Sequence, residues 1–292
     1  MGKANKERLK IINEIIEEYQ RDGYILTLRQ LYYQLVSRDV IPNKQSEYSK
    51  LSTILKEGRM AGIVDWGAIE DRLRRPSSPA SFDSPKHILE AAIQQYALPR
   101  QNGQAVYLEV WVEKDALSGV LKRVTEKYHI PILVNRGYSS VSAMYDSFMR
   151  FVHRAAWKER DVKIIYLGDY DPSGLDMIRD IASRIEEFQV GYNDGHLVEE
   201  MFFEVIPIAL TKEQIDQYDP PPNPAKITDP RAKNFIKKHG DMSWEVDALR
   251  PDVLNQLLDD AILSYIDEDL YKEILEQEKV DKEKLKSLID LI

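Results

Sequence analysis

Three carboxylates stand where two apolar segments of the sequence end. Glu113 follows the alternating segment 106–112, and Asp169 and Asp171 follow the apolar segment 163–168. The one-residue spacing of the two aspartates puts both on the same side of an extended chain. Clustered carboxylates need a neutralising charge, and a hard cation that prefers oxygen ligands, Mg²⁺ or Mn²⁺, suits them. The alternative is structural, with Asp169 capping the following helix and Glu113 pairing with Lys114 or another neighbour.

A second candidate group is the tyrosine pair Tyr32-Tyr33, whose second member comes four residues after Arg29. Adjacent tyrosines in a helix point to different faces, so one can pack while the other is presented. Arg29 lies one turn before Tyr33 on the same face, where a guanidinium could lower the pKa of the phenol and hold a phosphate. The alternative is that both rings belong to the core and its rim.

Other chemistries are excluded by what the sequence lacks. The chain of 292 residues has no cysteine, so thiol catalysis, disulfides and cysteine-ligated metals are excluded. It contains neither of the glycine-rich phosphate-loop patterns, so no ATPase is expected, and neither H-E-x-x-H nor G-x-S-x-G occurs. No apolar run approaches the roughly 18 residues of a membrane span, and we expect a cytoplasmic protein without membrane contact.

The charge is unevenly distributed. The net charge is −9, but residues 1–75 carry 14 basic and 11 acidic side chains, while residues 76–292 carry 26 and 38. This distribution is compatible with DNA held by the first part and a metal held by the second.

The first part shows three amphipathic helical patterns with tight connections. Thr27 is a suitable N-cap for the second of them. Three short helices in this order favour a winged-helix or helix-turn-helix DNA-binding domain, with a plain three-helix bundle as the alternative. The predicted helices are 3–21, 28–36 and 46–60.

The rest of the chain alternates strands with helices, which predicts an α/β domain with an open, mostly parallel sheet and its ligand site at the carboxyl ends of the strands. The predicted strands are 106–112, 130–134, 163–168 and 201–208. The predicted helices are 88–96, 116–128, 141–156, 175–188, 251–265, 269–276 and 281–291, with a long proline-rich loop at 219–230. The expected division is a DNA-binding domain at 1–75, a linker with a connecting helix at 76–100, and an α/β domain with a C-terminal helical extension at 101–292.

Taken together, these residues resemble the family that comprises the A-type, DNA-cleaving component of topoisomerase VI and the meiotic double-strand-break transesterase. Members of that family join a winged-helix domain that bears a nucleophilic tyrosine to a Toprim metal-binding domain. The family's Arg-x-x-Tyr-Tyr element, with the nucleophile at its second tyrosine, matches Arg29 and Tyr33, and its Toprim carboxylates match Glu113, Asp169 and Asp171. The resemblance implies Mg²⁺-dependent double-strand DNA cleavage by transesterification, with Mn²⁺ as a substitute.

The segment 244–249, Trp-Glu-Val-Asp-Ala-Leu, is similar to a further Glu-x-x-Ala-Leu element of the family. The chain is shorter than the full topoisomerase component, and it most resembles the stand-alone Mini-A-like proteins. The resemblance implies a homodimer, in which the tyrosine of one protomer meets the metal of the other, and a separate ATPase subunit for a complete topoisomerase. The C-terminal helices and the sheet edge are the expected dimer contacts.

Basic residues of the first part and of the proline-rich loop are expected to hold the backbone of double-stranded DNA without reading its sequence. They are Arg38, Lys44, Lys50, Lys56, Arg59, Arg72, Arg74, Arg75, Lys226 and Arg231.

Two competing functions remain open. A related branch, the Toprim component of Wadjet-type plasmid defence, cuts DNA by metal-assisted hydrolysis, so the chain could be a hydrolytic nuclease that does not use Tyr33. It could also be a DNA-binding scaffold whose Toprim fold is idle.

Overall fold

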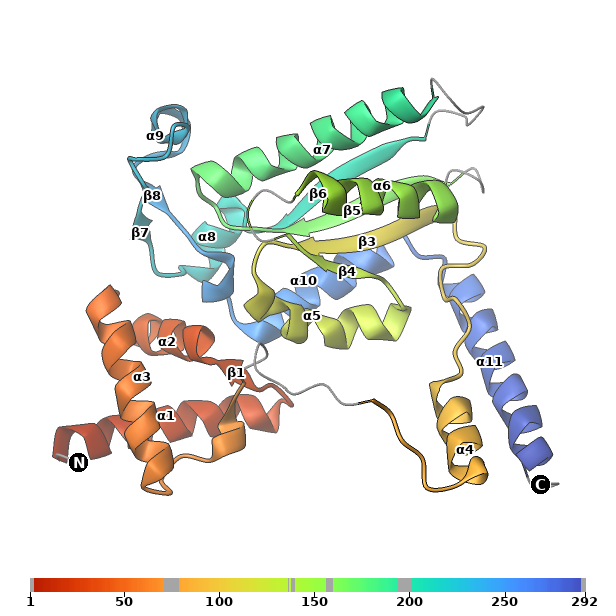
Figure 1. Ribbon diagram of the computed structural model, residues 1–292. Coiled ribbons are helices and arrows are strands. Elements are labelled where there is room, and N and C mark those ends of the chain that lie inside the picture. The colour runs from red at the N-terminus through yellow and green to blue at the C-terminus, as the bar shows by residue number, and fades with distance from the viewer. Residues whose placement is uncertain are drawn as a thin grey trace.

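The computed structural model consists of a small helical N-terminal part beside a larger α/β part, with a pair of helices projecting from the latter (Figure 1). The residues it describes are 3–70, 79–135, 137, 140–155, 160–193 and 201–289.

The N-terminal part is built from three helices and two very short strands. In chain order they are α1 (Lys3–Arg21), β1 (Leu26–Thr27), α2 (Leu28–Ser37), α3 (Gln45–Met60), the 3₁₀ turn η1 (Trp66–Ala68) and β2 (Ile69–Glu70). Thr27 caps α2 as predicted, because its hydroxyl accepts from the backbone N–H of Gln30 while the Gln30 side chain accepts from the backbone N–H of Thr27 at 2.9 Å. The apolar stripes of the three helices meet in a core of their own.

The short strands β1 and β2 pair in parallel, with Leu26 opposite Ile69. Among residues 3–70, therefore, the three predicted helices are present without an antiparallel wing. The three-helix arrangement agrees with the sequence, and the winged-helix assignment stays a prediction.

The α/β part contains the predicted parallel sheet. Its strands are β3 (Val106–Val112), β4 (Ile132–Val134), β5 (Asp161–Leu167) and β6 (Phe203–Ala209). They are parallel and lie in the order β4-β3-β5-β6, so β3 and β5 are central. This arrangement confirms the α/β class, because parallel strands need helical crossovers to reach their neighbours.

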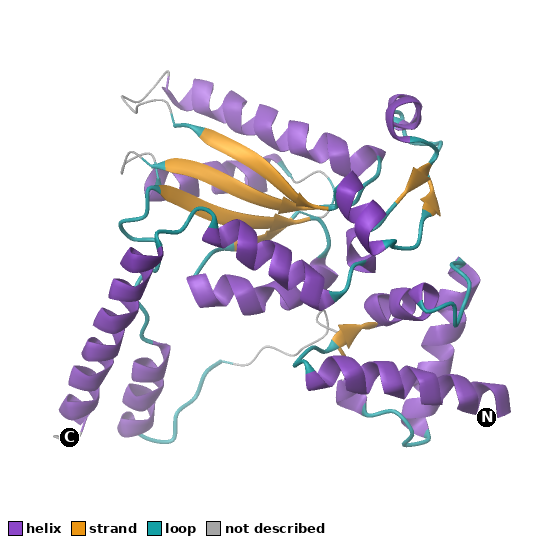
Figure 2. Cartoon of the chain, turned by 180° about the vertical axis from the view of Figure 1, so that it is seen from behind, coloured by secondary structure: helices purple, strands orange, loops and turns teal. Residues whose placement is uncertain are grey.

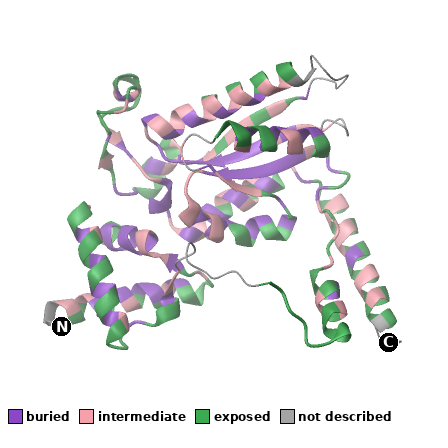
Figure 3. Ribbon diagram, viewed as in Figure 1, coloured by how far each residue is buried: buried purple, intermediate pink, exposed green. Residues whose placement is uncertain are grey.

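Two layers of helices cover the sheet, and the central strands are buried between them (Figures 2 and 3). One face packs against α5 (Asp115–Tyr128) and α10 (Pro251–Leu263), the other against α6 (Val141–Arg154) and α7 (Pro172–Asn193). Since both faces are covered, most residues of the central strands are apolar and buried; Glu109 of β3 and Asp161 and Lys163 of β5 are the charged exceptions.

The helices α4 (Pro85–Gln95) and α11 (Glu268–Ile289) lie side by side (Figure 1). Polar contacts join α11 to the segment after α4, including Tyr96 Oη to Asp281 at 3.1 Å and the Leu98 N–H to Glu278 at 3.0 Å. The sequence predicted two helices, 269–276 and 281–291, where the structure has the single helix α11. The prediction of a break was wrong because neither glycine nor proline occurs between 268 and 289.

The segment between β6 and α10 contains more regular structure than predicted. It forms α8 (Lys212–Tyr218), β7 (Asn223–Pro224), α9 (Ala232–His239), β8 (Met242–Ser243) and the 3₁₀ turn η3 (Val246–Ala248). Strands β7 and β8 form a two-stranded antiparallel sheet, so the predicted proline-rich loop contains one of its strands. A bridge between Tyr170 and Trp244 ties the end of this segment to the loop after β5.

Turn η3 is one of the places where the two parts of the molecule touch. Ala248 is buried in the core of the N-terminal part, and α2 lies against η3. None of the helices in the described ranges has the length and apolar composition needed to cross a membrane.

Candidate active site

The three predicted carboxylates lie together at the carboxyl edge of the sheet. The Glu113 N–H donates to the carbonyl of Leu167 at 3.0 Å, which extends the β3–β5 pairing by one residue. The Glu113 carboxylate then accepts from the backbone N–H of Asp169 at 3.1 Å. Asp171 follows on the same loop, and its Oδ1 accepts from the N–H of Gly174 at 2.7 Å at the start of α7.

The loop after β5 is tightly wound. A Cβ on Gly174 would lie 2.1 Å from the carbonyl oxygen of Asp169, so only glycine fits at this position. Asp171, rather than Asp169, is the residue that caps α7. The capping role that the structural alternative gave to Asp169 is therefore wrong.

Asp169 is 9% exposed and has partners from two distant segments. Its carboxylate accepts from the N–H of Val246 at 2.8 Å, and the ammonium of Lys114 lies 2.9 Å from its Oδ1. Lys114 thus pairs with Asp169, and not with Glu113 as the structural alternative supposed.

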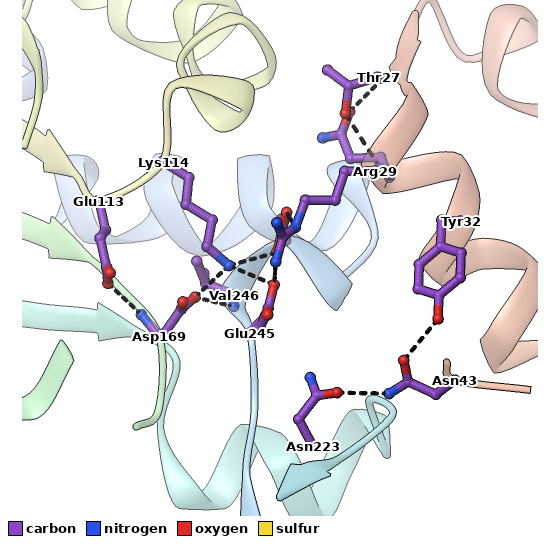
Figure 4. A network of polar contacts seen from close by, with 12 residues as sticks. Thr27, Arg29, Tyr32, Asn43, Glu113, Lys114, Asp169, Asn223, Glu245 and Val246 are labelled. Carbon is purple, nitrogen blue, oxygen red and sulfur yellow. Dashed lines mark hydrogen bonds and ion pairs between the residues drawn. The ribbon is translucent and has the colours of Figure 1, made fainter. Parts of the chain in front are cut away.

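Lys114 is the centre of the polar network (Figure 4). Its Nζ also lies 2.9 Å from Glu245 Oε2 and 2.8 Å from Asp247 Oδ1. Asp247, in η3, has no exposed surface. We call the five acidic side chains that meet here the carboxylate edge: Glu113, Asp169, Asp171, Glu245 and Asp247.

A second cation reaches the carboxylate edge from the N-terminal part. Arg29 of α2 forms ion pairs with Glu245 and with Asp247, the latter at 2.9 Å from Nε to Oδ2. Figure 4 shows its side chain pointing from α2 toward Glu245 and Lys114. Arg29 was predicted to hold a phosphate, and in the structure its guanidinium forms ion pairs with carboxylates.

The pKa values of two carboxylates at the carboxylate edge are raised, by burial and by neighbouring negative charge. Burial, followed by the nearby charges of Asp169 and Asp171, raises the pKa of Glu113 to about 7. Burial also raises the pKa of Asp169, although Lys114 acts in the opposite direction. A cation bound beside Glu113 and Asp169 would therefore stabilise the ionised form of both carboxylates.

The donors at the edge are oxygens of carboxylates, the ligands that a hard divalent cation prefers. Burial, together with the charges of Asp169 and Asp171, outweighs the opposing charge of Lys114 in raising the pKa of Glu113. Among the described residues, no three acidic or histidine side chains are already arranged as a metal cage. The donor set fits Mg²⁺, and the assignment of Glu113, Asp169 and Asp171 as its ligands stays a prediction.

The two tyrosines of α2 play different parts. Tyr32 donates to Asn43 Oδ1 at 2.9 Å, so its hydroxyl is engaged within the N-terminal part. The phenol of Tyr33 lies beneath Arg29, whose guanidinium carbon is 5.8 Å from the ring centroid. Both rings are buried, at 5% and 4% exposure, in the core of the N-terminal part, which agrees with the structural alternative for the pair and not with one ring being presented.

The surroundings of Tyr33 connect it to the carboxylate edge. Burial, followed by the charge of Asp247, raises the pKa of its phenol, while Arg29 and Lys114 act to lower it. Arg29 thus has the predicted influence, but burial outweighs it. These neighbours place the Tyr33 phenol on the side of α2 that faces η3.

The predicted DNA contacts of the N-terminal part have varied surroundings. Lys44 and Lys56 are exposed at the start and middle of α3. Lys50 pairs with Glu47, Arg38 pairs with Glu18, and Arg59 donates to the backbone carbonyls of Trp66 and Ile69. Arg72, Arg74 and Arg75 lie outside the described residues.

A cavity of about 540 Å³ opens between α3 and the start of α5, and Arg29, Lys56 and Arg59 line it. In the segment 219–231, Lys226 is exposed, whereas Arg231 pairs with Asp229 at 2.7 Å and with Asp176 at 3.2 Å. The predicted lysine contacts Lys44, Lys50, Lys56 and Lys226 are all in exposed positions, and Lys50 among them pairs with Glu47.

Sequence reasoning missed two members of the site, Lys114 and Asp247. Lys114 follows Glu113 directly, and a basic residue beside a strand-end carboxylate was the available signal. Asp247 lies inside the 244–249 element, of which Glu245, Ala248 and Leu249 had been matched.

Compared with protein-family models and with curated proteins, the chain matches none of them.

Proposed function

We propose that this chain is a topoisomerase VI A-like enzyme that cleaves double-stranded DNA in a Mg²⁺-dependent transesterification, with Tyr33 as nucleophile. The observation that carries the proposal is the meeting of α2 with the carboxyl edge of the sheet. Arg29 lies over the Tyr33 ring and Lys114 pairs with Asp169. The two cations share Glu245 and Asp247 as partners, which links α2 to the carboxylates of the sheet.

Glu113, Asp169 and Asp171 would hold the divalent cation, because they are the carboxylates that follow the two central strands. When bound, the cation supplies positive charge that stabilises the phosphate and the departing oxygen.

Tyr33 forms the new bond. Its phenolic oxygen attacks the phosphorus, the bond to the 3′-oxygen breaks, and the products are a 5′-phosphotyrosyl link and a free 3′-hydroxyl. The phenol loses its proton in this step and the 3′-oxygen gains one. Because burial raises the pKa of Tyr33, the phenol needs a proton acceptor, and Asp247 is the nearby carboxylate that could serve.

Arg29 has two tasks in this scheme. It lowers the cost of a negative phenolate on Tyr33, and it fixes α2 against Glu245 and Asp247. Lys44 and Lys56 then provide exposed charges for the DNA backbone. The homodimer and the separate ATPase subunit stay predictions.

A hydrolytic nuclease is the second candidate, and the burial of Tyr33 favours it. A phenol that is 4% exposed and has a raised pKa is a poor nucleophile until the site rearranges. In that case the carboxylate edge acts on a water molecule and α2 only binds DNA. A non-catalytic scaffold would use neither Tyr33 nor the carboxylates.

Supercoiled plasmid incubated with the protein and Mg²⁺ or Mn²⁺ tests these alternatives. Reactions are stopped with detergent and run with and without protease, so that DNA attached to protein is recognised. The variants are Tyr33→Phe and Asp169→Ala, and Tyr32→Phe is the matched control because it removes the neighbouring hydroxyl.

Transesterification predicts linear DNA that needs protease to enter the gel and that both Tyr33→Phe and Asp169→Ala abolish, while Tyr32→Phe retains it. Cutting that survives Tyr33→Phe but not Asp169→Ala would identify a hydrolytic nuclease. Cutting by none of the proteins, with DNA still bound, would favour the scaffold.

A further inference from the structure

A third tyrosine approaches the carboxylate edge from inside the sheet. Tyr166 lies on β5, in register with Trp111 of β3, and is 1% exposed. Glu113 follows Trp111 by two residues, so the alternation of side chains puts it on the same face of the sheet as Tyr166. That face is covered by α6 and α7.

The phenol of Tyr166 points along β5 toward the loop that carries the aspartates. A Cβ on Gly168 would lie 2.6 Å from the Tyr166 hydroxyl oxygen, so the absence of a side chain at Gly168 makes room for it. The charges of Glu113, Asp169 and Asp171 add to burial in raising the pKa of Tyr166, which keeps the phenol protonated and able to donate.

The hydroxyl of Tyr166 is buried and has no hydrogen-bond partner among the described residues. Other buried tyrosines of the α/β part are satisfied: Tyr107 donates to Glu109 at 3.0 Å and Tyr128 donates to Asp259 at 2.9 Å. A buried hydroxyl without a partner is unfavourable, and it is explained by stored strain, by a catalytic role, or by a water or ion bound at the site. The charged groups that act on Tyr166 are Glu113, Asp169 and Asp171, so an ion held at the carboxylate edge is the explanation that this position favours.

We propose that Tyr166 is a positioning residue of the carboxylate edge, whose hydroxyl donates a hydrogen bond to Glu113 in the cation-bound protein and holds that carboxylate in its ligating orientation. Glu113 accepts one hydrogen bond on Oε2 from the Asp169 N–H, which leaves Oε1 able to accept another. Groups that orient a metal-binding carboxylate in this way contribute to metal affinity without touching the metal. The inference rests on the divalent-cation site of the proposed function.

Isothermal titration of the full chain with Mn²⁺ tests the role of Tyr166 independently of DNA cleavage. Tyr166→Phe removes only the hydroxyl. Tyr19→Phe is the matched control, because the Tyr19 hydroxyl is also buried without a partner among the described residues but belongs to the core of the N-terminal part. Glu113→Gln serves as the variant expected to lose binding, and thermal unfolding without cation reports on the fold of each protein.

We expect Tyr166→Phe to weaken Mn²⁺ binding about tenfold or more, while Tyr19→Phe binds as the wild type does. Without cation, Tyr166→Phe should unfold at or above the wild-type temperature, because its hydroxyl has no bond to lose. Wild-type affinity in Tyr166→Phe, with or without a lowered unfolding temperature, would overturn the inference and leave the proposed function standing. A wild type that does not bind Mn²⁺ would overturn both.

Discussion

Lys114 provides the sharpest test of the electrostatic reasoning, because three carboxylates share its ammonium. Its Nζ lies 2.8 to 2.9 Å from Asp169, Glu245 and Asp247, and its side chain is 17% exposed. Burial disfavours the charge on Lys114, but Asp247 and Asp169 outweigh burial and raise its pKa. The attraction within the network therefore exceeds the cost of taking this ammonium out of water.

Lys114→Met keeps a side chain of similar length but removes the charge. Removing one partner of a buried ion pair costs about 3–5 kcal/mol, because it leaves an uncompensated buried charge. Arg29 still contacts Glu245 and Asp247, so Asp169 is the carboxylate left without a cation. We therefore expect the lower end of the range, a loss of about 3 kcal/mol in the free energy of unfolding.

Urea unfolding followed by circular dichroism measures this loss in divalent-free buffer. Lys122→Met is the matched control, since Lys122 lies on the same helix, α5, and is 59% exposed beside Glu126 at 3.9 Å. A surface pair of this kind contributes about 0.5 kcal/mol or less. Since Lys114→Met makes the edge more negative, Mg²⁺ should stabilise this variant more than the wild type.

Two results would refute the reasoning about Lys114. One is a loss within about 1 kcal/mol of that in Lys122→Met, which would mean that the carboxylates do not depend on the lysine. The other is a smaller stabilisation by Mg²⁺ in Lys114→Met than in the wild type, which would mean that Lys114 assists cation binding rather than competing with it.

Two further predictions concern other acidic groups. In divalent-free buffer the pKa of Glu113 is about 7 when folded, against an ordinary 4.5, so the folded protein keeps a proton that the unfolded chain loses. The free energy of unfolding, measured with urea, should therefore fall by up to about 3 kcal/mol as the pH rises from 4.5 to 7. A Glu113→Gln variant whose free energy of unfolding falls as much over the same pH range would contradict the prediction. Arg150 donates to the fully buried Glu109 from Nε and Nη2, each at 3.0 Å. Arg150→Met should cost about 3–5 kcal/mol by the same measurement. A loss below about 1 kcal/mol would show that Tyr107 and Trp111, which also donate to Glu109, are sufficient partners for its buried carboxylate.

The sequence was sufficient for the positions of Glu113, Asp169 and Asp171, because these depend on local pattern and on one rule of sheet geometry. Apolar runs locate β3 and β5, and parallel strands end at a common edge. The apolar pattern of each strand and the residues that follow it are enough, so the sequence predicts that the three carboxylates meet even without the order of the strands.

The rest of the site depends on contacts between residues far apart in the chain. Lys114 meets Glu245 and Asp247 across 131 and 133 residues, and no spacing in the sequence encodes that meeting. The burial of Tyr33 likewise depends on how α2 lies against η3, whereas helical periodicity gives only the face on which the ring stands. The sequence analysis did not predict helix α9 (Ala232–His239), because the proline-rich stretch directly before it has the composition of a loop.

Arg29 connects the docking of α2 to the charge of the site. It contacts Glu245 and Asp247, and the charge of Asp169 also acts on it. Its guanidinium and a divalent cation beside Asp169 are like charges, so each should weaken the hold of the other, and this coupling is reciprocal. Arg29→Gln should therefore bind Mg²⁺ about fivefold or more tightly in titration calorimetry, the lower end of usual coupling energies, while amide hydrogen exchange in α2 becomes faster. Weaker Mg²⁺ binding in Arg29→Gln would instead mean that the arginine orients the carboxylates for the cation. Metal binding would then hold Tyr33, which lies on the same helix, in place rather than release it.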